Sequence, residues 1–321
     1  MSTESAAAQP PVAAPPEPAG VLLIDKPAGM TSHDVVAAVR RMLHIRQVGH
    51  FGTLDPFATG VLPLSIGKAT RLAQFYLKSR KSYRGTICFG FATDTYDATG
   101  ARAAEPVDCR PEAREIERVF AEFTGRIKQT PPAFSAKRVK GVRAYELARR
   151  RESVELEPVE VEVYAFELLA LDGAEAQFAV ECSGGTYVRS LAHDVGRRLG
   201  CPAHLSHLHR TAVAEFTESQ AVSLTDLERA AAGGDSARFL IPLEGLLPDC
   251  PALVLRGREE QDVRHGHSFE LAQALRADRG LGPGGHAPAI TLLKVMNGDR
   301  RLIAIARRVA GNVYHPDLVL A

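Results

Sequence analysis

The sequence lacks the cysteine pattern of a cross-linked protein. Its five cysteines are an odd number, lie between Cys88 and Cys250, and form no C-x-x-C pair, which argues against a disulfide framework. The sequence also lacks the basic start of a signal peptide, since no Lys or Arg precedes Lys26. No apolar run approaches the ~20 residues of a membrane span. We therefore expect a soluble, cytoplasmic protein without a signal peptide.

Familiar cofactor and nucleophile signatures are missing as well. No G-x-G-x-x-G follows an expected strand and no G-x-S-x-G occurs, so neither a dinucleotide cradle nor a serine-hydrolase elbow is predicted. Residues 65–69 (SIGKA) resemble the end of a P-loop. However, Leu62 replaces its first glycine and Ala69 its magnesium-binding hydroxyl, so a nucleotide site is not predicted either.

Three closely spaced histidines raise the question of a metal site. His204, His207 and His209 lie near Cys201, but zinc sites usually add further cysteine or carboxylate ligands at a recognisable spacing. Packing or surface histidines are the favoured interpretation, and no metal site is predicted.

Charge is unevenly distributed in a chain whose formal net charge is only +1. Residues 56–93 contain no acid, and residues 124–151 contain one. The bases of the two blocks are Lys68, Arg71, Lys78, Arg80, Lys81 and Arg84, and then Arg126, Lys128, Lys137, Arg138, Lys140, Arg143, Arg149, Arg150 and Arg151. Such blocks favour a localised surface for a polyanion. Two solvated faces balanced by acids elsewhere account for the charge equally well, so charge alone does not decide.

Hydrophobic periodicity predicts an α+β protein. An apolar strand begins at Gly20, after an Ala/Pro-rich tail over 1–18 that cannot bury a core and is expected to be disordered. Apolar spacing from Val35 to Leu43 predicts an amphipathic helix with Ser32 as its N-cap. Helices are also expected over 68–77, 112–123 and 186–199, and strands over 83–91, 159–163 and 177–181. Their irregular order predicts a mixed, largely antiparallel sheet with flanking helices over residues 19–250.

The character of the chain changes near Pro251. Short apolar strands over 253–255, 289–293, 302–306 and 318–320 alternate with Gly/Pro-rich turns, and residues 280–288 are expected to form a loop. This pattern predicts a small β-rich module over residues 251–321.

One loop has a composition suited to chemistry. Residues 50–64 contain a single carboxylate, Asp55, among Gly52, Pro56, Gly60 and Pro63. Glycine lets the backbone approach a ligand closely, and proline stiffens a loop. By itself, however, an aspartate before proline is a common turn residue, and spacing alone favours that interpretation.

Four segments follow one another in a distinctive order: 26–32 (KPAGMTS), 49–60 (GHFGTLDPFATG), 81–84 (KSYR) and 182–189 (CSGGTYVR). They resemble the successive motifs of the TruB family, the bacterial tRNA pseudouridine-55 synthases, and the likeness extends from about residue 20 to residue 248. It implies the pseudouridine synthase fold and isomerisation of one T-loop uridine of tRNA, without cofactor or metal. The module over 251–321 resembles a reduced PUA domain, an RNA-binding appendage of the family.

The resemblance implies three catalytic residues. Asp55 matches the family's nucleophilic aspartate, and Arg189 matches the arginine that pairs with it and favours its charged form. Tyr83 matches the tyrosine that stacks on the target base and is a candidate for proton transfer at the sugar. Moving a glycosidic bond from nitrogen to carbon requires a nucleophile that holds one half, which a carboxylate can do covalently. Attack on C1′ of the ribose and attack on C6 of the base both meet this need.

Other matches concern substrate binding. Tyr187 matches a second pocket tyrosine, and Leu208 matches an apolar residue against the base. His50 resembles the histidine that helps to hold the remodelled T-loop once the uridine has left the stack, which offsets part of the cost of flipping. Asp94 and Asp97 match a family signature and are expected to order their loop.

The basic block over 124–151 matches a family insertion that closes over the tRNA. Its predicted phosphate contacts, which fix the RNA without reading sequence, are Lys137, Arg138, Lys140 and Arg143. One departure from the family lies next to His50, where Phe51 replaces a residue that is usually small or hydroxylic. Different packing is expected there.

Two other functions stay open at this point. One is a non-catalytic RNA-binding or RNA-folding protein on the same scaffold. The other is a synthase that acts on another RNA. The set of Asp55, Tyr83 and Arg189 favours catalysis, because a pure binder has no need of the carboxylate. The predicted partner is tRNA, with no membrane and no obligatory protein partner.

Overall fold

The computed structural model describes residues 18–135, 137–139, 142–144, 147, 150, 156–271 and 290–320. The tail predicted over 1–18, apart from Pro18, and the loop predicted over 280–288 lie outside these residues. Throughout the described ranges, helices are too short or too polar to cross a bilayer.

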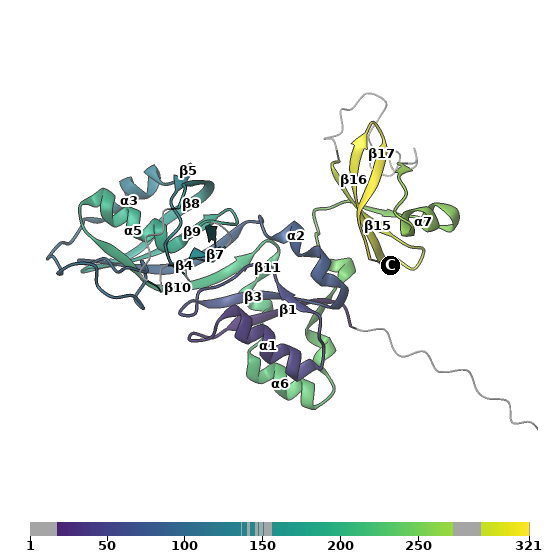
Figure 1. The fold of residues 1–321 in the computed structure, drawn as a ribbon, viewed down its shortest axis with the longest axis horizontal. Helices are drawn as coiled ribbons and strands as arrows, with labels where there is room; N and C mark the ends of the chain where they lie inside the picture. Colours follow the sequence, from purple (N-terminus) through teal and green to yellow (C-terminus); the bar gives the residue numbers. More distant parts are fainter. Residues whose placement is uncertain are drawn as a thin grey trace, which may run out of the picture.

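A large sheet forms the body of the molecule (Figure 1). Its strands are β1 (Gly20–Lys26), β2 (Val48–His50), β3 (Thr59–Ile66), β4 (Lys81–Phe89), β5 (Gly125–Gln129), β8 (Val159–Asp172), β9 (Glu175–Cys182), β10 (Ala203–Val213), β11 (Phe216–Thr217) and β12 (Leu240–Pro242). They follow the order β12-β1-β3-β10-β4-β9-β8-β5, with β2 beside β3 and β11 beside β10. All pairs are antiparallel except β3 with β10, which confirms the predicted mixed, largely antiparallel sheet.

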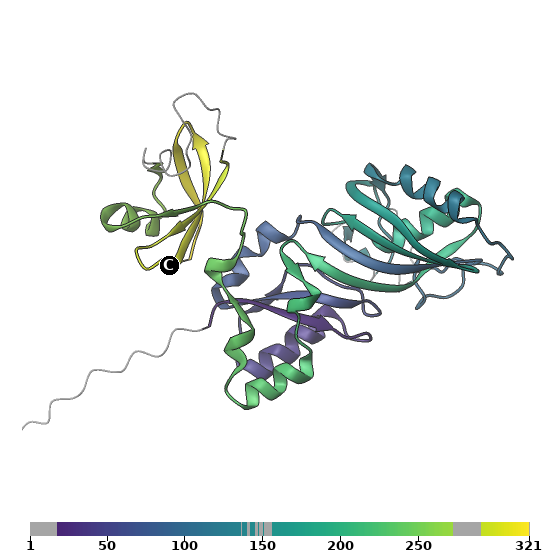
Figure 2. The same cartoon turned by 180° about the vertical axis from the view of Figure 1, so that it is seen from behind.

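Helices cover the two halves of the large sheet separately (Figures 1 and 2). The helices are α1 (Ser32–Leu43), α2 (Ala73–Tyr76), α3 (Ala113–Glu122), α5 (Val188–Leu199), α6 (Leu224–Ala232) and α7 (Gly257–Arg264), with 3-10 turns η1 (Gly67–Leu72), η2 (Glu218–Gln220), η3 (Ser236–Phe239) and η4 (Leu243–Gly245). Helices α1 and α6 pack on β1 and β3 around Val35, Leu62 and Leu227. Helices α3 and α5 pack on β4, β8 and β9 around Phe120 and Phe178. Each half therefore has its own core.

Two details of the predicted helices were wrong. The first helix is capped by Thr31 rather than Ser32, because the Thr31 side chain accepts from the Asp34 backbone and Asp34 accepts in return. Ser32 is instead the first helical residue, and its hydroxyl is buried against Leu54. The helix predicted over 68–77 is split into η1 and the short α2.

A smaller five-stranded sheet follows the large one. Its strands are β13 (Ala252–Val254), β14 (Phe269–Glu270), β15 (Leu292–Met296), β16 (Leu302–Ala310) and β17 (Val313–Val319), in the order β13-β15-β16-β17-β14. Met296, Ile305 and Leu318 share a buried cluster with Phe51 and Tyr76 of the large-sheet body. The small sheet is thus packed against the body through apolar side chains, and its PUA-like character stays a prediction.

A single disulfide joins Cys109 to Cys201, whose Cα atoms lie 5.9 Å apart. The pair ties the segment before α3 to the end of α5 across a sequence separation of 92. The expectation from the cysteine pattern, which argued against disulfides, was wrong for this pair, because only the fold brings such distant positions together.

Candidate active site

The Asp55 loop lies at the seam between the two halves of the large sheet. Strand β3 meets β10 there through the parallel pairing of Thr59 with His209 and of Gly60 with Arg210. Gly60 has a φ of +98°, and a Cβ at this position would overlap the carbonyl oxygen of Arg210. Glycine is therefore required where the two strands approach.

Arg210 of β10 holds the Asp55 loop in place, and its side chain is fully buried. Its guanidinium donates to the carbonyl oxygens of Val61 (2.8 Å), Thr53 (3.3 Å) and Gly52 (3.1 Å). Buried carbonyls require such partners, so one side chain determines the backbone path on both sides of Asp55. No pattern in the sequence indicated this residue, because an arginine inside a strand belongs to no motif.

A buried lysine holds the other side of the loop. The Lys26 ammonium donates to the carbonyl oxygens of Pro27 (2.8 Å), Met30 (2.7 Å) and Pro56 (3.2 Å). Burial lowers the pKa of Lys26 to about 8, although the charge of Asp55 opposes this effect. The residue before Asp55 is fixed as well, because the Leu54 amide donates to the Ser32 hydroxyl at 2.9 Å.

Asp55 and Arg189 form a bidentate pair. Arg189 is 5% exposed, and its Nε and Nη2 donate to Oδ2 and Oδ1 of Asp55 at 2.8 and 3.0 Å. The Asp55 side chain remains 33% exposed. Two parallel hydrogen bonds of this kind fix the plane of a carboxylate, so Asp55 is oriented while one side of it is open to a substrate.

The remaining donors of Arg189 are also occupied. Nη1 donates to the Thr95 carbonyl (2.9 Å) and lies 3.4 Å from Oδ2 of buried Asp97, while Nη2 donates to the Phe134 carbonyl (3.0 Å). Asp97 in turn accepts from the hydroxyls of Thr95 and Thr99. The guanidinium therefore makes four hydrogen bonds with its five N–H groups and has an ion pair with Asp97 beside them. The role expected for Asp97, ordering its loop, includes this contact with Arg189.

An apolar wall lies beside Asp55. Tyr83 and Leu208 belong to the same buried cluster as Leu54 and Ala58, which flank Asp55 in the sequence. Burial raises the pKa of the Tyr83 hydroxyl to about 12, although the adjacent Arg210 opposes the shift. Tyr83 is thus a neutral phenol at physiological pH. The charge of Asp55 acts on Tyr83, while the contact of Tyr83 and Leu208 with the target base stays a prediction.

Tyr187 and the segment before the basic block meet at the start of α5. The side-chain amide of Gln129 donates to the Tyr187 carbonyl (3.0 Å), and its oxygen accepts from the Tyr187 amide (2.8 Å). Burial raises the pKa of the Tyr187 hydroxyl, which also faces Ser135. The end of β5 and the start of α5 are therefore joined next to the Asp55–Arg189 pair.

His50 is the last residue of β2 and comes just before the Asp55 loop. Its Nδ1 accepts from the Gly52 amide at 3.3 Å, and its ring lies edge-on to His33 with 5.7 Å between centroids. The neighbouring Phe51 points into the core, stacked on Tyr76 at 4.4 Å. Phe51 is therefore a core residue, while His50 next to it is half-buried.

His50 is expected to weaken the fold in acid. Burial lowers its pKa from the ordinary 6.5 to about 4, with smaller contributions from His33 and Arg210. Between these two values the unfolded chain binds more protons than the folded one, so the free energy of unfolding decreases as pH falls through this window. His50→Gln should flatten that part of the curve, measured by urea unfolding from pH 7 to pH 4. An equally steep curve would contradict this assignment.

The predicted phosphate contacts are only partly within the described residues. Lys137 is half-buried, and its ammonium donates to the Glu157 carbonyl at 3.5 Å. Arg138 and Arg143 lie opposite each other on a small ribbon of β6 (Arg138–Val139) and β7 (Val142–Arg143). Lys140 lies outside the described residues. Their contact with RNA stays a prediction.

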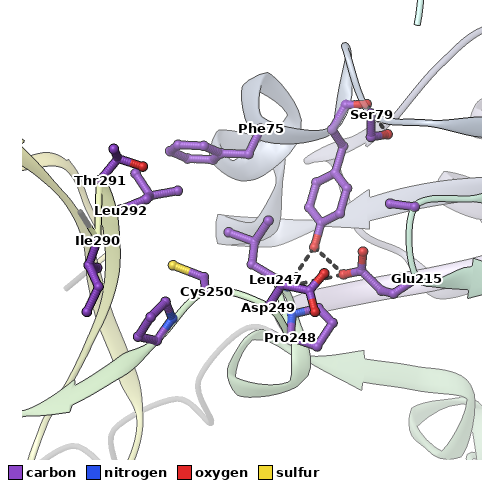
Figure 3. Close-up of a pocket in the computed structure, with 13 residues that line it drawn as sticks. Phe75, Ser79, Glu215, Leu247, Pro248, Asp249, Cys250, Ile290, Thr291 and Leu292 are labelled. Atoms are coloured by element: carbon purple, nitrogen blue, oxygen red, sulfur yellow. Dashed lines mark hydrogen bonds between the residues drawn. The ribbon is translucent and has the colours of Figure 1, made fainter. Parts of the chain in front are cut away.

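A sizeable cavity in the described residues lies elsewhere. About 520 Å³ lie between α2, the segment after η4 and the small sheet, near Phe75, Leu247 and Leu292 (Figure 3). Within it, the Tyr76 hydroxyl donates to Glu215 at 2.6 Å and accepts from the Leu247 amide. A cavity with two carboxylates, Glu215 and Asp249, is unsuited to RNA phosphates, and none of the predicted site residues lines it.

The Asp55 site has the features of a nucleophilic centre. It combines one oriented, partly exposed carboxylate, a neutral phenol and an apolar wall. Groups of three or more His, Cys, Asp or Glu able to hold a metal ion do not occur among the described residues. The side chains present are sufficient for covalent catalysis by a carboxylate and for holding a planar base.

Comparison with known proteins gives consistent matches. Residues 40–188 match the model of the TruB family pseudouridylate synthase (N terminal domain), and residues 189–248 match that of the tRNA pseudouridylate synthase B C-terminal domain. A tRNA pseudouridine synthase B of Solibacter usitatus is 46% identical over 301 residues, which cover 94% of this chain and 99% of that protein. One of Geobacillus kaustophilus is 48% identical over 260 residues, covering 78% and 91%.

Solved structures are similar over most of the chain. A crystal structure of a Cbf5-Nop10-Gar1 complex contains a chain that superposes with a TM-score of 0.69 and 27% identity, covering 94% of this chain and 85% of that one. A structure of an H/ACA RNP bound to a substrate RNA containing 2′-deoxyuridine gives a TM-score of 0.68 at 26% identity, with coverage of 94% and 85%.

Proposed function

Because the chain belongs to the TruB family of pseudouridine synthases, we propose that it isomerises the T-loop uridine at position 55 of tRNA, with Asp55 as the nucleophile. The names of its relatives support tRNA as the substrate. The observation that carries the proposal is the bidentate pair of Asp55 and Arg189, because it presents an oriented carboxylate beside an apolar wall.

The proposed reaction keeps the composition of the uridine unchanged. The bond from N1 to C1′ breaks, Asp55 bonds covalently to one half while the uracil turns, a bond from C5 to C1′ forms, and the bond to Asp55 then breaks and restores the carboxylate. The C5 proton leaves and N1 gains a proton. In this proposal the flipped base lies between Tyr83 and Leu208, and His50 contacts the loop that the base has left.

Arg189 acts in this proposal by holding Asp55 in its reactive orientation. Lysine keeps the charge but cannot make the bidentate contact or satisfy the same acceptors. Arg189→Lys should therefore lower kcat roughly 10²–10³-fold, with a smaller effect on KM. Tritium release from C5 of the target uridine measures both constants. Arg197→Lys on the exposed side of the same helix is the matched control, and equal kcat values for the two variants would contradict the role of Arg189.

An assay with purified RNAs tests the proposed function. Unmodified tRNA should yield pseudouridine at position 55, and a tRNA with cytidine at that position should yield none. Binding of tRNA without product from the parent protein would favour an RNA-binding or RNA-folding protein. Product from other RNAs but not from tRNA would favour a synthase with another substrate.

A further inference from the structure

The disulfide between Cys109 and Cys201 lies apart from the residues that the proposed reaction uses. Cys109 belongs to the chain that leads from β4 to α3, which we call the β4–α3 connection (residues 90–112). Cys201 follows the last residue of α5 by two positions. The bond therefore joins this connection to the helix whose first turn carries Arg189.

The two sulfur atoms differ in their access to solvent. Residues 101–110 are all exposed except Cys109, which is half-buried. Cys201 is 3% exposed and belongs to the apolar core of its half of the sheet. A dissolved thiol therefore reaches the bond from the Cys109 side. Disulfides that are open to solvent are the ones that thiols reduce most readily.

Residues 99–110 are held mainly by their own connection. The Ala103 amide donates to the Ala92 carbonyl at 2.9 Å, and the Val107 amide donates to the Gly90 carbonyl at 2.8 Å. Within the part of the chain that the structure describes, the hydrogen bonds of residues 99–110 all stay inside the β4–α3 connection. The disulfide is the bond that fastens this segment to α5.

The same connection reaches the Asp55 site at its other end. Thr95 and Asp97 contact Arg189 through a hydrogen bond and an ion pair. The Ala98 amide also donates to a carbonyl of β10 at 3.0 Å, so this end has an anchor besides the disulfide. Opening the disulfide would therefore free residues 99–110 and loosen the contacts with Arg189 only in part.

The other cysteines are poorly suited to thiol exchange. Burial raises the pKa of the Cys88 and Cys250 thiols, and it raises the pKa of Cys182 to about 11. The thiolate is the form that attacks a disulfide, and these three thiols hold their protons at neutral pH. Exchange with a small disulfide should therefore be slow at all three.

We propose that the pair of Cys109 and Cys201 is a reversible redox-modification site for small thiols of the glutathione class, and that opening the bond releases residues 99–110 from α5 and slows the reaction. The effect on the reaction rests on the proposed function, whereas the modification does not.

The exchange takes two steps. A thiolate bonds to Sγ of Cys109 and the bond between the two Sγ atoms breaks. Its electron pair stays on Sγ of Cys201, which takes up a proton. A second thiolate then bonds to the sulfur of the first, and Cys109 leaves as a thiolate that takes up a proton. Two small thiols are oxidised to one small disulfide, and the protein gains two electrons and two protons.

Two matched single variants test the site of exchange. Cys201→Ser leaves Cys109 as a half-exposed thiol, and Cys109→Ser leaves the buried Cys201. After incubation with glutathione disulfide, mass spectrometry should find at least about tenfold more mixed disulfide on Cys109 in the first variant than on Cys201 in the second. Equal labelling would overturn the assignment of the attack to Cys109. In the parent, millimolar reduced glutathione should open the bond, and a bond that stays closed would overturn its reversibility.

The double variant Cys109→Ser/Cys201→Ser has the bond permanently open and tests the release of the segment. Trypsin should cut after exposed Arg102 about tenfold faster than in the oxidised parent, because local unfolding becomes easier. Cleavage after exposed Arg300, between β15 and β16, should not change. Single-turnover pseudouridine formation should slow about threefold, well below the effect of a 1 Å misplacement. Cys88→Ser keeps the disulfide and is the matched control.

Each remaining outcome decides one part of the proposal. Parental cleavage after Arg102 in the double variant would overturn the release of the segment. Faster cleavage with a parental rate of pseudouridine formation would overturn the effect on the reaction. The parent opened by reduced glutathione repeats both measurements without a substitution, so a variant that fails to fold leaves the test intact. Cleavage and exchange are measured without RNA, so failure of the proposed function is distinguishable.

Discussion

Asp55→Asn is expected to lower the rate of pseudouridine formation by at least about 10⁴-fold, since an amide is not a nucleophile and the covalent step cannot begin. The side chain keeps its size, and its oxygen can still accept from Arg189. The fold and the affinity for tRNA should therefore change little. Single-turnover measurements with excess protein separate the chemical step from binding.

The control for this experiment is Asp172→Asn at the exposed end of β8, which removes the same charge far from the seam and should keep the parental rate. A loss of less than tenfold in Asp55→Asn would assign the nucleophile to another group. A large loss accompanied by unfolding would instead assign Asp55 a role in stability, which circular dichroism and thermal unfolding distinguish.

Arg210→Met is expected to lower the free energy of unfolding by about 3–5 kcal/mol. Methionine fills a similar volume but donates no hydrogen bond. The carbonyls of Val61, Thr53 and Gly52 then lose their partner, and a buried polar group without a partner costs about 1–3 kcal/mol. Urea unfolding at neutral pH measures the difference.

Arg80→Met provides the contrast. Arg80 is 54% exposed, pairs with Glu181 at 3.1 Å and lies over the Tyr164 ring, yet exposed pairs contribute only about 0–1 kcal/mol. If the free energy of unfolding falls no more in Arg210→Met than in Arg80→Met, water replaces the guanidinium at the three carbonyls. Activity should fall together with stability in Arg210→Met, because the same contacts position Asp55.

Local patterns in the sequence predicted much of the fold. Alternating valines over 159–163 mark part of β8, and the apolar spacing after Thr31 marks α1. The cap of α1 was assigned one residue too late, because Thr31 and Ser32 are both good caps and only the three-dimensional structure shows that Leu54 occupies the Ser32 hydroxyl. The division of the helix expected over 68–77 likewise depends on packing.

The site was predictable where ordered motifs exist and not where contacts are long-range. Asp55 and Arg189 are 134 positions apart, and only the family resemblance connected them. Arg210 and Lys26 act on backbone carbonyls, which every residue carries, so no partner residue type in the sequence indicates their contacts. The disulfide between Cys109 and Cys201 was unpredictable for the same reason, since two positions that only folding brings together share no local sequence pattern.

The four hydrogen bonds of the buried Arg189 have a consequence for how the substrate is accommodated. A guanidinium held by four acceptors and by the charge of Asp97 cannot readily turn toward an incoming ligand, so the orientation of Asp55 is set before RNA arrives. In the proposed reaction, reorganisation then falls on the nucleic acid, whose loop opens to deliver the base. Loops that are already loosened by a mismatch or by missing tertiary contacts should therefore react faster than tightly folded ones.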